Sequence, residues 1–270
     1  MKGVHVAVSD LTRTFESVHG QNPVHALGPV SFHINPGEFL SVVGPSGCGK
    51  STLMECIAGL TTPTSGRIVV GDVTVSGEVP SGVGVVFQEN AAFPWLTVDE
   101  NISFGLKHSN VTLPANEIRN RVDEAIELIG LQAFKSHYPS QLSGGMRQRV
   151  AIARTLVTKP DFILMDEPFG ALDPQTRLLM GDELLKIWRA SGATVFLITH
   201  SLEEAVLLSD RVLAMTARPG KIKTEIKTPW SKDRTTDISS SPQFGQLVSE
   251  LWGVMREESK LAMAQSERIA

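Results

Sequence analysis

The chain has 270 residues, a formal net charge of −4 and a pI near 6.0. This charge argues against a strongly basic surface, so nucleic acid is not an expected partner. The hydrophobic share of 41% and the charged share of 20% are ordinary for a soluble globular protein. No stretch approaches the roughly 18 apolar residues of a membrane helix, and the start of the chain lacks the apolar core of a secretory signal. We therefore expect a cytoplasmic protein with one large domain, with or without a small appendage.

Short apolar runs alternate with helical stretches along most of the chain, which predicts an α/β layered core. Several runs are almost unbroken, as expected of central strands that are covered on both faces. The predicted strands are Val4–Val8, Val30–Ile34, Phe39–Val43, Arg67–Val70, Val83–Phe87, Phe162–Met165, Thr194–Ile198 and Arg211–Met215. The predicted helices of this core are Lys50–Ala58, Gln175–Arg189 and Leu202–Leu208.

The sequence changes character between residues 88 and 159. Helical periodicity replaces the strand pattern there, and it returns between residues 147 and 157. We therefore predict a helical subdomain inserted into the core at about residues 89–160. The apolar residues that carry the first helical pattern are Ile118, Val122, Ile126 and Ile129.

The last fifty residues predict a helical extension. A hairpin-like passage follows Pro219-Gly220, and the stretch Ser231–Ser241 is polar. The segment Phe244–Met263 is amphipathic. We predict a main domain over residues 1–227 and an extension over residues 228–270. The residues expected on one face of the final helix are Leu247, Leu251, Trp252 and Met255.

The sequence GPSGCGKS at Gly44–Ser51 fits the phosphate-loop pattern GxxxxGK[ST]. A predicted strand runs directly into it and a predicted helix begins at Lys50, which is the context that this motif needs. The glycines let backbone N–H groups approach phosphates without interference from Cβ atoms. Lys50 would neutralise charge on the β and γ phosphates, and the Ser51 hydroxyl would ligate Mg²⁺. The motif therefore predicts a site for a nucleoside triphosphate.

A second glycine-rich helix start, LSGGM at Leu142–Met146, lies about ninety residues downstream. A helix N-terminus preceded by Ser143, Gly144 and Gly145 can bind phosphate oxygens through free N–H groups and the positive end of the helix dipole. A single subunit does not need a second cradle so far from the first. The sequence therefore predicts a nucleotide held between two copies of the chain, as in an ATP-driven clamp.

Polar residues follow three of the predicted strands. The carboxyl ends of parallel strands meet at one edge of a sheet, so these residues should lie near Ser51. Asp166 is expected beside Mg²⁺, while Glu167 is expected to polarise the attacking water. His200 would sense the γ-phosphate, and Gln88 could reach Mg²⁺ or the water. The alternatives are a solvated loop start for the acidic pair and a structural role for the histidine.

Six motifs in order resemble those of an ATP-binding cassette subunit, over nearly the whole chain. The resemblance implies a P-loop NTPase (RecA-like) core with an N-terminal antiparallel β portion and an inserted helical subdomain. It also implies ATP and Mg²⁺ as ligands, and a head-to-tail pair of cassettes with ATP at the interface. The motifs are Gly44–Ser51 (Walker A), Gln88 (Q-loop), Leu142–Met146 (signature), Phe162–Glu167 (Walker B), Ala171-Leu172-Asp173 (D-loop) and His200 (switch histidine).

The resemblance also implies a role for each site residue. Catalysis falls to Glu167, His200 and Gln88, and Mg²⁺ would be held by Ser51, Gln88 and Asp166. Phe15 stands where the family places an aromatic ring against adenine, although it could instead be a core residue at a strand edge. The remaining nucleotide contacts would be Gly44, Pro45, Ser46, Gly47, Cys48, Gly49, Lys50, Ser51, Thr52, Ser143, Gly144, Gly145 and Asp173.

Three stretches resemble the cassettes of bacterial nitrate, sulfonate, taurine and bicarbonate importers: Gln88–Val98, Leu213–Gly220 and the helix around Trp252–Glu257. This implies an ATPase subunit on the inner face of the membrane that drives a separate permease. A periplasmic or lipoprotein solute-binding protein would take part indirectly. The alternatives are an exporter's cassette and an ABC ATPase without a transport role. The apolar segment Phe93–Leu96 either packs in the helical core or lines a groove for a permease helix.

Overall fold

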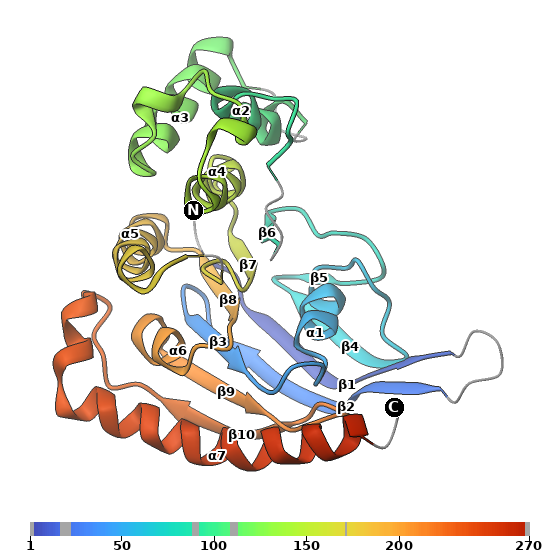
Figure 1. The fold of residues 1–270 in the computed structure, drawn as a ribbon. Helices are drawn as coiled ribbons and strands as arrows, with labels where there is room; N and C mark the ends of the chain where they lie inside the picture. Colours follow the sequence, from blue (N-terminus) through green and yellow to red (C-terminus); the bar gives the residue numbers. More distant parts are fainter. Residues whose placement is uncertain (1–2, 17–22, 88–91, 109–112, 171, 268–270) are drawn as a thin grey trace.

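The computed structural model describes residues 3–16, 23–87, 92–108, 113–170 and 172–267. They form two β-sheets with helices around them (Figure 1). The strands are β1 (Val6–Phe15), β2 (Val24–Ile34), β3 (Phe39–Val43), β4 (Ser65–Val70), β5 (Val73–Thr74), β6 (Val83–Val86), β7 (Phe162–Asp166), β8 (Thr194–Ile198), β9 (Arg211–Met215) and β10 (Ile222–Lys227). The α-helices are α1 (Lys50–Ile57), α2 (Val98–Lys107), α3 (Ala115–Leu128), α4 (Gly144–Leu156), α5 (Pro174–Ser191), α6 (Leu202–Leu208) and α7 (Pro242–Glu267).

The larger sheet has the strand order β10-β9-β3-β8-β7-β6. Its strands from β9 to β6 are parallel, and only β10 runs antiparallel, beside β9. Every residue of β3, β7, β8 and β9 is buried, as their almost unbroken apolar sequences predict. The carboxyl ends of β3, β7, β8 and β9 therefore meet at one edge of the sheet.

The smaller sheet is antiparallel, with the order β2-β1-β4-β5, so the predicted α/β class with an antiparallel β portion is confirmed. Its apolar face, the helix α1 and one face of the larger sheet share a single hydrophobic cluster. Strands β1 and β2 are longer than predicted. Their outer parts carry exposed polar residues, which break the apolar pattern that the sequence prediction relied on.

Helices α2, α3 and α4 enclose a hydrophobic cluster of their own, away from the larger sheet in Figure 1. The predicted periodicity of residues 118–129 corresponds to α3, in which Val122 and Ile126 are buried. Helix α2 had no separate prediction. Its start is fixed by a capping box, since the Thr97 hydroxyl accepts the Glu100 N–H and the Glu100 carboxylate accepts the Thr97 N–H.

Helix α7 runs along the base of the molecule in Figure 1 and packs on α6 and β9. Phe244, Leu251 and Met255 are buried in the cluster that also covers α5 and α6. The prediction that Trp252 shares this face is wrong, because its side chain is 60% exposed. Consecutive residues lie about 100° apart around a helix, so burial of Leu251 turns Trp252 outward.

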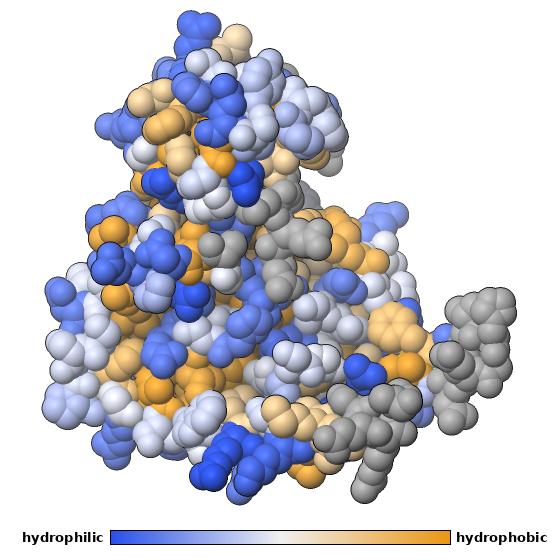
Figure 2. All heavy atoms as spheres, viewed as in Figure 1, coloured by the Kyte–Doolittle hydropathy of each residue, from blue (hydrophilic) through white to orange (hydrophobic). Residues whose placement is uncertain are grey.

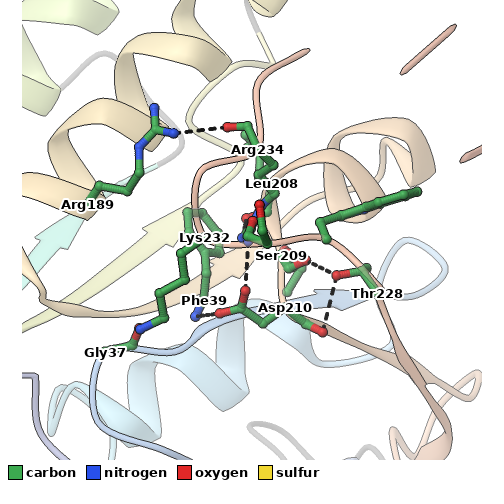
Figure 3. A network of polar contacts seen from close by, with 12 residues as sticks. Gly37, Phe39, Arg189, Leu208, Ser209, Asp210, Thr228, Lys232 and Arg234 are labelled. Atoms are coloured by element: carbon green, nitrogen blue, oxygen red, sulfur yellow. Dashed lines mark hydrogen bonds and ion pairs between the residues drawn. The ribbon is translucent and has the colours of Figure 1, made fainter. Parts of the chain in front are cut away.

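A polar network fastens the segment before α7 to the larger sheet (Figure 3). The buried Arg234 guanidinium donates to Asp210 Oδ1 at 2.7 Å and to the Leu208 carbonyl oxygen. Asp210 Oδ2 accepts the Phe39 N–H at 2.9 Å, and Arg189 donates to the Arg234 carbonyl oxygen at 3.2 Å. These bonds hold the C-terminal segment at the amino ends of β3 and β9.

Polar residues predominate on the face shown in Figure 2, with apolar areas in its lower half over α5 and α6. A cavity of about 410 Å³ opens there between α5, α6 and the start of α7. Among the described residues, none of the helices has the length and apolar character that crossing a bilayer demands. The apolar residues lining the cavity include Phe169, Pro174, Leu178, Leu207, Leu208 and Phe244.

Candidate nucleotide site

The glycine-rich loop connects the buried strand β3 to α1, as predicted. Gly49 stands at the N-cap of α1 with a φ of 108°, and a Cβ there would lie 2.8 Å from the Ala26 carbonyl oxygen. Only glycine fits both conditions. The Lys50 ammonium is buried over the loop and donates to the carbonyl oxygens of Gly44 at 2.8 Å and Pro45 at 3.0 Å. The loop therefore presents a fixed cation beside its backbone N–H groups.

Asp166 ends β7 and lies against the start of α1, where it receives a hydrogen bond from Ser51. Burial raises the pKa of Asp166, while the Ser51 hydrogen bond and the charge of Lys50 lower it. The side chain is 7% exposed, and its Oδ1 atom has no hydrogen-bond partner in the described part of the chain. A buried carboxylate oxygen without a partner is a natural ligand for a cation.

Glu167 contacts His200 across the carboxyl edge of the sheet. Its Oε1 atom lies 2.8 Å from His200 Nδ1, and its backbone N–H donates to the Ile198 carbonyl oxygen at 2.8 Å. The backbone of Glu167 has a φ of 47°, a left-handed conformation that is sparsely populated outside glycine and recurs at functional sites. Burial raises the pKa of the Glu167 carboxyl, and His200 partly offsets this rise.

The phosphate loop, Glu167 and His200 surround one cavity of about 400 Å³. Phe15 forms part of its wall and is 37% exposed, with the Arg13 guanidinium 4.4 Å above its ring. The structure thus brings together nine residues predicted from the sequence. They are Phe15, Ser46, Gly47, Gly49, Lys50, Ser51, Thr52, Glu167 and His200, and the other lining residues are Val24, Ala26 and Arg218.

The second predicted phosphate-binding segment, the helix start at Ser143–Gly145, does not line this cavity. Ser143 caps α4 by accepting the Met146 N–H at 3.3 Å, and Gly144 and Gly145 form the first turn. The residues that line the cavity described above include none from the 142–146 segment. A Cβ on Gly145 would lie 2.8 Å from the Leu172 side chain, so this helix start packs against the segment that precedes α5.

Three further residues predicted for the site are not among the described residues that line the cavity. The Asp173 carboxylate caps α5, since it accepts the N–H groups of Gln175 at 3.1 Å and Thr176 at 3.0 Å, and these bonds lower its pKa. Its contact with nucleotide stays a prediction. Gln88 and Ala171 lie outside the described residues.

Comparison with known proteins identifies the family. A family model described as "ABC transporter" matches residues 27–170, which is more than half of the chain. The chain belongs to the ABC transporter family. It is an ATP-binding cassette with ATPase activity.

Relatives align with this cassette over nearly its whole length. The ABC transporter ATP-binding protein MJ0412 of Methanocaldococcus jannaschii is 45% identical over 94% of this chain and 92% of its own. The taurine import ATP-binding protein TauB of Roseobacter denitrificans is 40% identical over 93% of this chain and 96% of its own. The nitrate import ATP-binding protein NrtD of a Synechocystis species is 43% identical over 94% and 96%.

A solved structure agrees with the fold. The dimeric ATP-binding cassette MJ0796, in a post-hydrolysis state bound to ADP and phosphate, is 32% identical to this cassette. It superimposes with a TM-score of 0.73 over 84% of this chain and 100% of its own. The predicted P-loop NTPase fold is thereby confirmed.

Sequence reasoning missed Arg218, a second cation at the cavity of this cassette. Its Nε and Nη2 atoms each lie 3.1 Å from the Gly47 carbonyl oxygen. The residue follows β9, which is the parallel neighbour of β3. A basic residue just past the carboxyl end of a strand next to the loop strand is a signal that could have identified it.

Proposed function

We propose that this cassette hydrolyses ATP to drive solute import through a separate permease, with taurine, sulfonate, nitrate or bicarbonate as the class of solute. The support is that relatives named for taurine and nitrate import align with it over more than nine tenths of its length. The cassette would lie in the cytoplasm on the inner face of the membrane. A periplasmic or lipoprotein binding protein would deliver the solute.

The loop would bind the triphosphate of ATP through its N–H groups, with the Lys50 ammonium neutralising charge on the β and γ phosphates. The residues present fit Mg²⁺, because Ser51 contacts the Asp166 carboxylate, whose buried Oδ1 atom has no partner among the residues that the structure describes. Asp166 and Ser51 would therefore hold the ion, with Gln88 as a third predicted ligand. When bound, Mg²⁺ supplies further neutralisation of phosphate charge.

Glu167 would accept a proton from the water that attacks the γ-phosphate. Its burial brings the pKa of the carboxyl closer to neutrality, which improves its match to this task. His200, at 2.8 Å, would hold the carboxylate and meet the γ-phosphate with its other ring nitrogen. Because phosphoryl transfer needs little covalent chemistry from the protein, positioning and charge neutralisation do most of the catalysis.

A second copy of the chain would complete the site. The main support for this pairing is that no residue of the Ser143–Gly145 helix start lines the cavity around the loop of its own copy. Head-to-tail pairing would bring the cradle of one copy over the ATP bound to the loop of the other, with Asp173 nearby. Leu178 and Leu179 on α5 are 44% and 68% exposed, which suits a protein contact on this side.

Transport by the assembled system is the test. The cassette would be reconstituted with its permease in proteoliposomes, and uptake of labelled taurine, a sulfonate, nitrate and bicarbonate would be measured with and without ATP. ATP-dependent uptake of one of these anions, lost in Lys50→Ala, is expected. ATP-driven efflux would instead favour the exporter alternative. Failure to associate with any membrane subunit would favour an ABC ATPase without a transport role.

A further inference from the structure

The turn Ala217–Gly220 contacts the phosphate loop at two points. The Arg218 guanidinium donates two hydrogen bonds of 3.1 Å to the Gly47 carbonyl oxygen. A Cβ on Gly220 would lie 2.2 Å from the Cys48 carbonyl oxygen, so the turn presses directly on the loop and only glycine fits there. The turn is also joined to β2, because Gly220 donates to the Ala26 carbonyl oxygen at 3.0 Å.

Helix α7 holds the same turn from the other side. The Glu258 carboxylate is 4% exposed, and its Oε2 atom accepts the Ala217 N–H at 2.8 Å. Lys223 donates to the other oxygen of this carboxylate at 2.8 Å. About two helical turns further on, Gln265 Nε2 donates to the Arg218 carbonyl oxygen at 2.9 Å. The backbone on both sides of the Ala217–Arg218 bond is therefore fixed by α7.

The bonds from Arg218 to the Gly47 carbonyl oxygen fix the orientation of the Gly47–Cys48 peptide in the phosphate loop. In a planar trans peptide the carbonyl and the N–H point in opposite directions. When Arg218 holds the Gly47 carbonyl on one side of this peptide, the Cys48 N–H points to the other side, where it donates to the Pro45 carbonyl oxygen at 3.3 Å. This bond closes the turn of the loop, so the orientation of the Gly47–Cys48 peptide helps to set the shape of the phosphate-binding loop. Helix α7 is itself anchored, because it follows the segment around Arg234 that is bound to the larger sheet (Figure 3).

We propose that the Ala217–Gly220 turn is a brace that α7 fixes against the phosphate loop, and that Arg218 is a positioning residue for nucleotide binding. The inference rests on the proposed role of the loop in binding the phosphates of ATP. Arg218 acts through the Gly47 peptide, and α7 acts through Arg218. The C-terminal helix thereby sets the affinity of a site to which it contributes no predicted nucleotide contact.

The test compares five full-length proteins: wild type, Arg218→Ala, Arg218→Lys, Gln265→Ala and Arg256→Ala. Arg256 is an exposed cation on α7 outside the contacts described above, so its variant controls for the loss of charge. The Kd for ADP is measured by calorimetry, KM and kcat are measured for ATP, and Tm is measured without nucleotide. Loss of one hydrogen-bonding group corresponds to roughly three- to tenfold in an equilibrium constant.

We expect Arg218→Ala to raise the Kd for ADP and the KM for ATP about three- to tenfold, with kcat within about twofold of wild type. Arg218→Lys should recover part of the loss. Gln265→Ala, which is remote from the cavity, should raise the Kd about twofold, and Arg256→Ala should match wild type.

A wild-type Kd in Arg218→Ala, or a lower Tm alone, would overturn the proposal that the turn acts as a brace. A wild-type Kd in Gln265→Ala would overturn the role of α7, and an equal effect of Arg256→Ala would show a general charge effect. If wild type itself binds no ADP, the proposed function fails first.

Discussion

Glu204 on α6 is a buried carboxyl, close enough to Glu167 for the two charges to interact. Its Oε2 atom accepts the Thr199 hydroxyl at 2.8 Å, and its Oε1 atom finds no partner among the residues that the structure describes. Burial raises the pKa of Glu204 to about 7, against the lowering effects of the Thr199 bond and Arg177, and with Glu167 raising it further. The side chain therefore titrates near neutral pH.

This titration predicts a pH-dependent stability. The folded chain binds the proton of Glu204 more tightly than the unfolded chain does, so the stabilisation is fully present below the unfolded pKa of about 4.5 and is lost as the pH rises through about 7. Glu204→Gln keeps an acceptor for the Thr199 hydroxyl but cannot ionise. The variant should match wild type at pH 5 and be more stable at pH 8, by at most about 3 kcal/mol.

Thermal unfolding of both proteins between pH 5 and pH 8 checks this expectation, with Glu203→Gln as a control because Glu203 is the exposed neighbour. Parallel curves for Glu204→Gln and wild type would contradict the assigned pKa. A pH-dependent gain of the same size in Glu203→Gln would show that the effect is not due to burial.

The connection before α2 contains both a buried anchor and an exposed ring. The sequence left open whether the segment Phe93–Leu96 packs in the helical core or contacts the permease. Asn101 is fully buried and binds the connection through four hydrogen bonds, to Phe93 N–H and to the carbonyl oxygens of Phe93, Leu96 and Thr97. Trp95, in contrast, is 69% exposed and stacks on Phe93 with ring centroids 5.5 Å apart. The exposed ring favours a partner contact over core packing.

Two variants test this division. Trp95→Ala should leave the Tm and ATP affinity of the isolated cassette unchanged but abolish ATP-dependent transport by the assembled system, because the permease loses an apolar contact. Asn101→Ala should lower the Tm of the isolated cassette, because several backbone groups lose their partner. A similar loss of Tm in Trp95→Ala would instead support core packing.

The success of the sequence predictions depended on how continuous each pattern is. The strands β3, β8 and β9 and the helix α6 were predicted with their observed bounds, since every residue of the three strands and all residues of α6 except Glu203 are buried. Strand β10 was predicted only as part of a hairpin-like passage. Its residues alternate in exposure, and it is held by pairing with β9. Tertiary pairing of this kind leaves little trace in local sequence.

Part of the site could be predicted in the same way, from patterns that are local in the sequence. The loop, Glu167 and His200 follow parallel strands, so their meeting at one edge followed from the fold class alone. The contact between Arg218 and Gly47 did not follow. It requires the turn after β9 to fold back on the loop, and that turn is fixed by residues of α7 some forty positions later.

For the whole molecule, the separation of two phosphate cradles is the central feature. One copy presents the loop with Lys50, Glu167 and His200 around a single cavity, and no residue of the Ser143–Gly145 helix start lines that cavity. A structural relative that is 32% identical is a dimer bound to ADP and phosphate. We therefore expect ATP to join two copies and Glu167 to end this state by promoting hydrolysis.

Size-exclusion chromatography of Glu167→Gln with ATP and Mg²⁺ tests this claim most directly. Glutamine keeps the reach of the side chain but is a far poorer proton acceptor, so hydrolysis should fall by roughly 10²–10⁴-fold. Loss of a negative charge near the γ-phosphate should also favour closure. We predict that the variant elutes as a dimer with ATP and as a monomer with ADP, while wild type stays largely monomeric under both conditions. Hydrolysis at the wild-type rate, or equal dimerisation with ADP, would contradict the proposed role of Glu167.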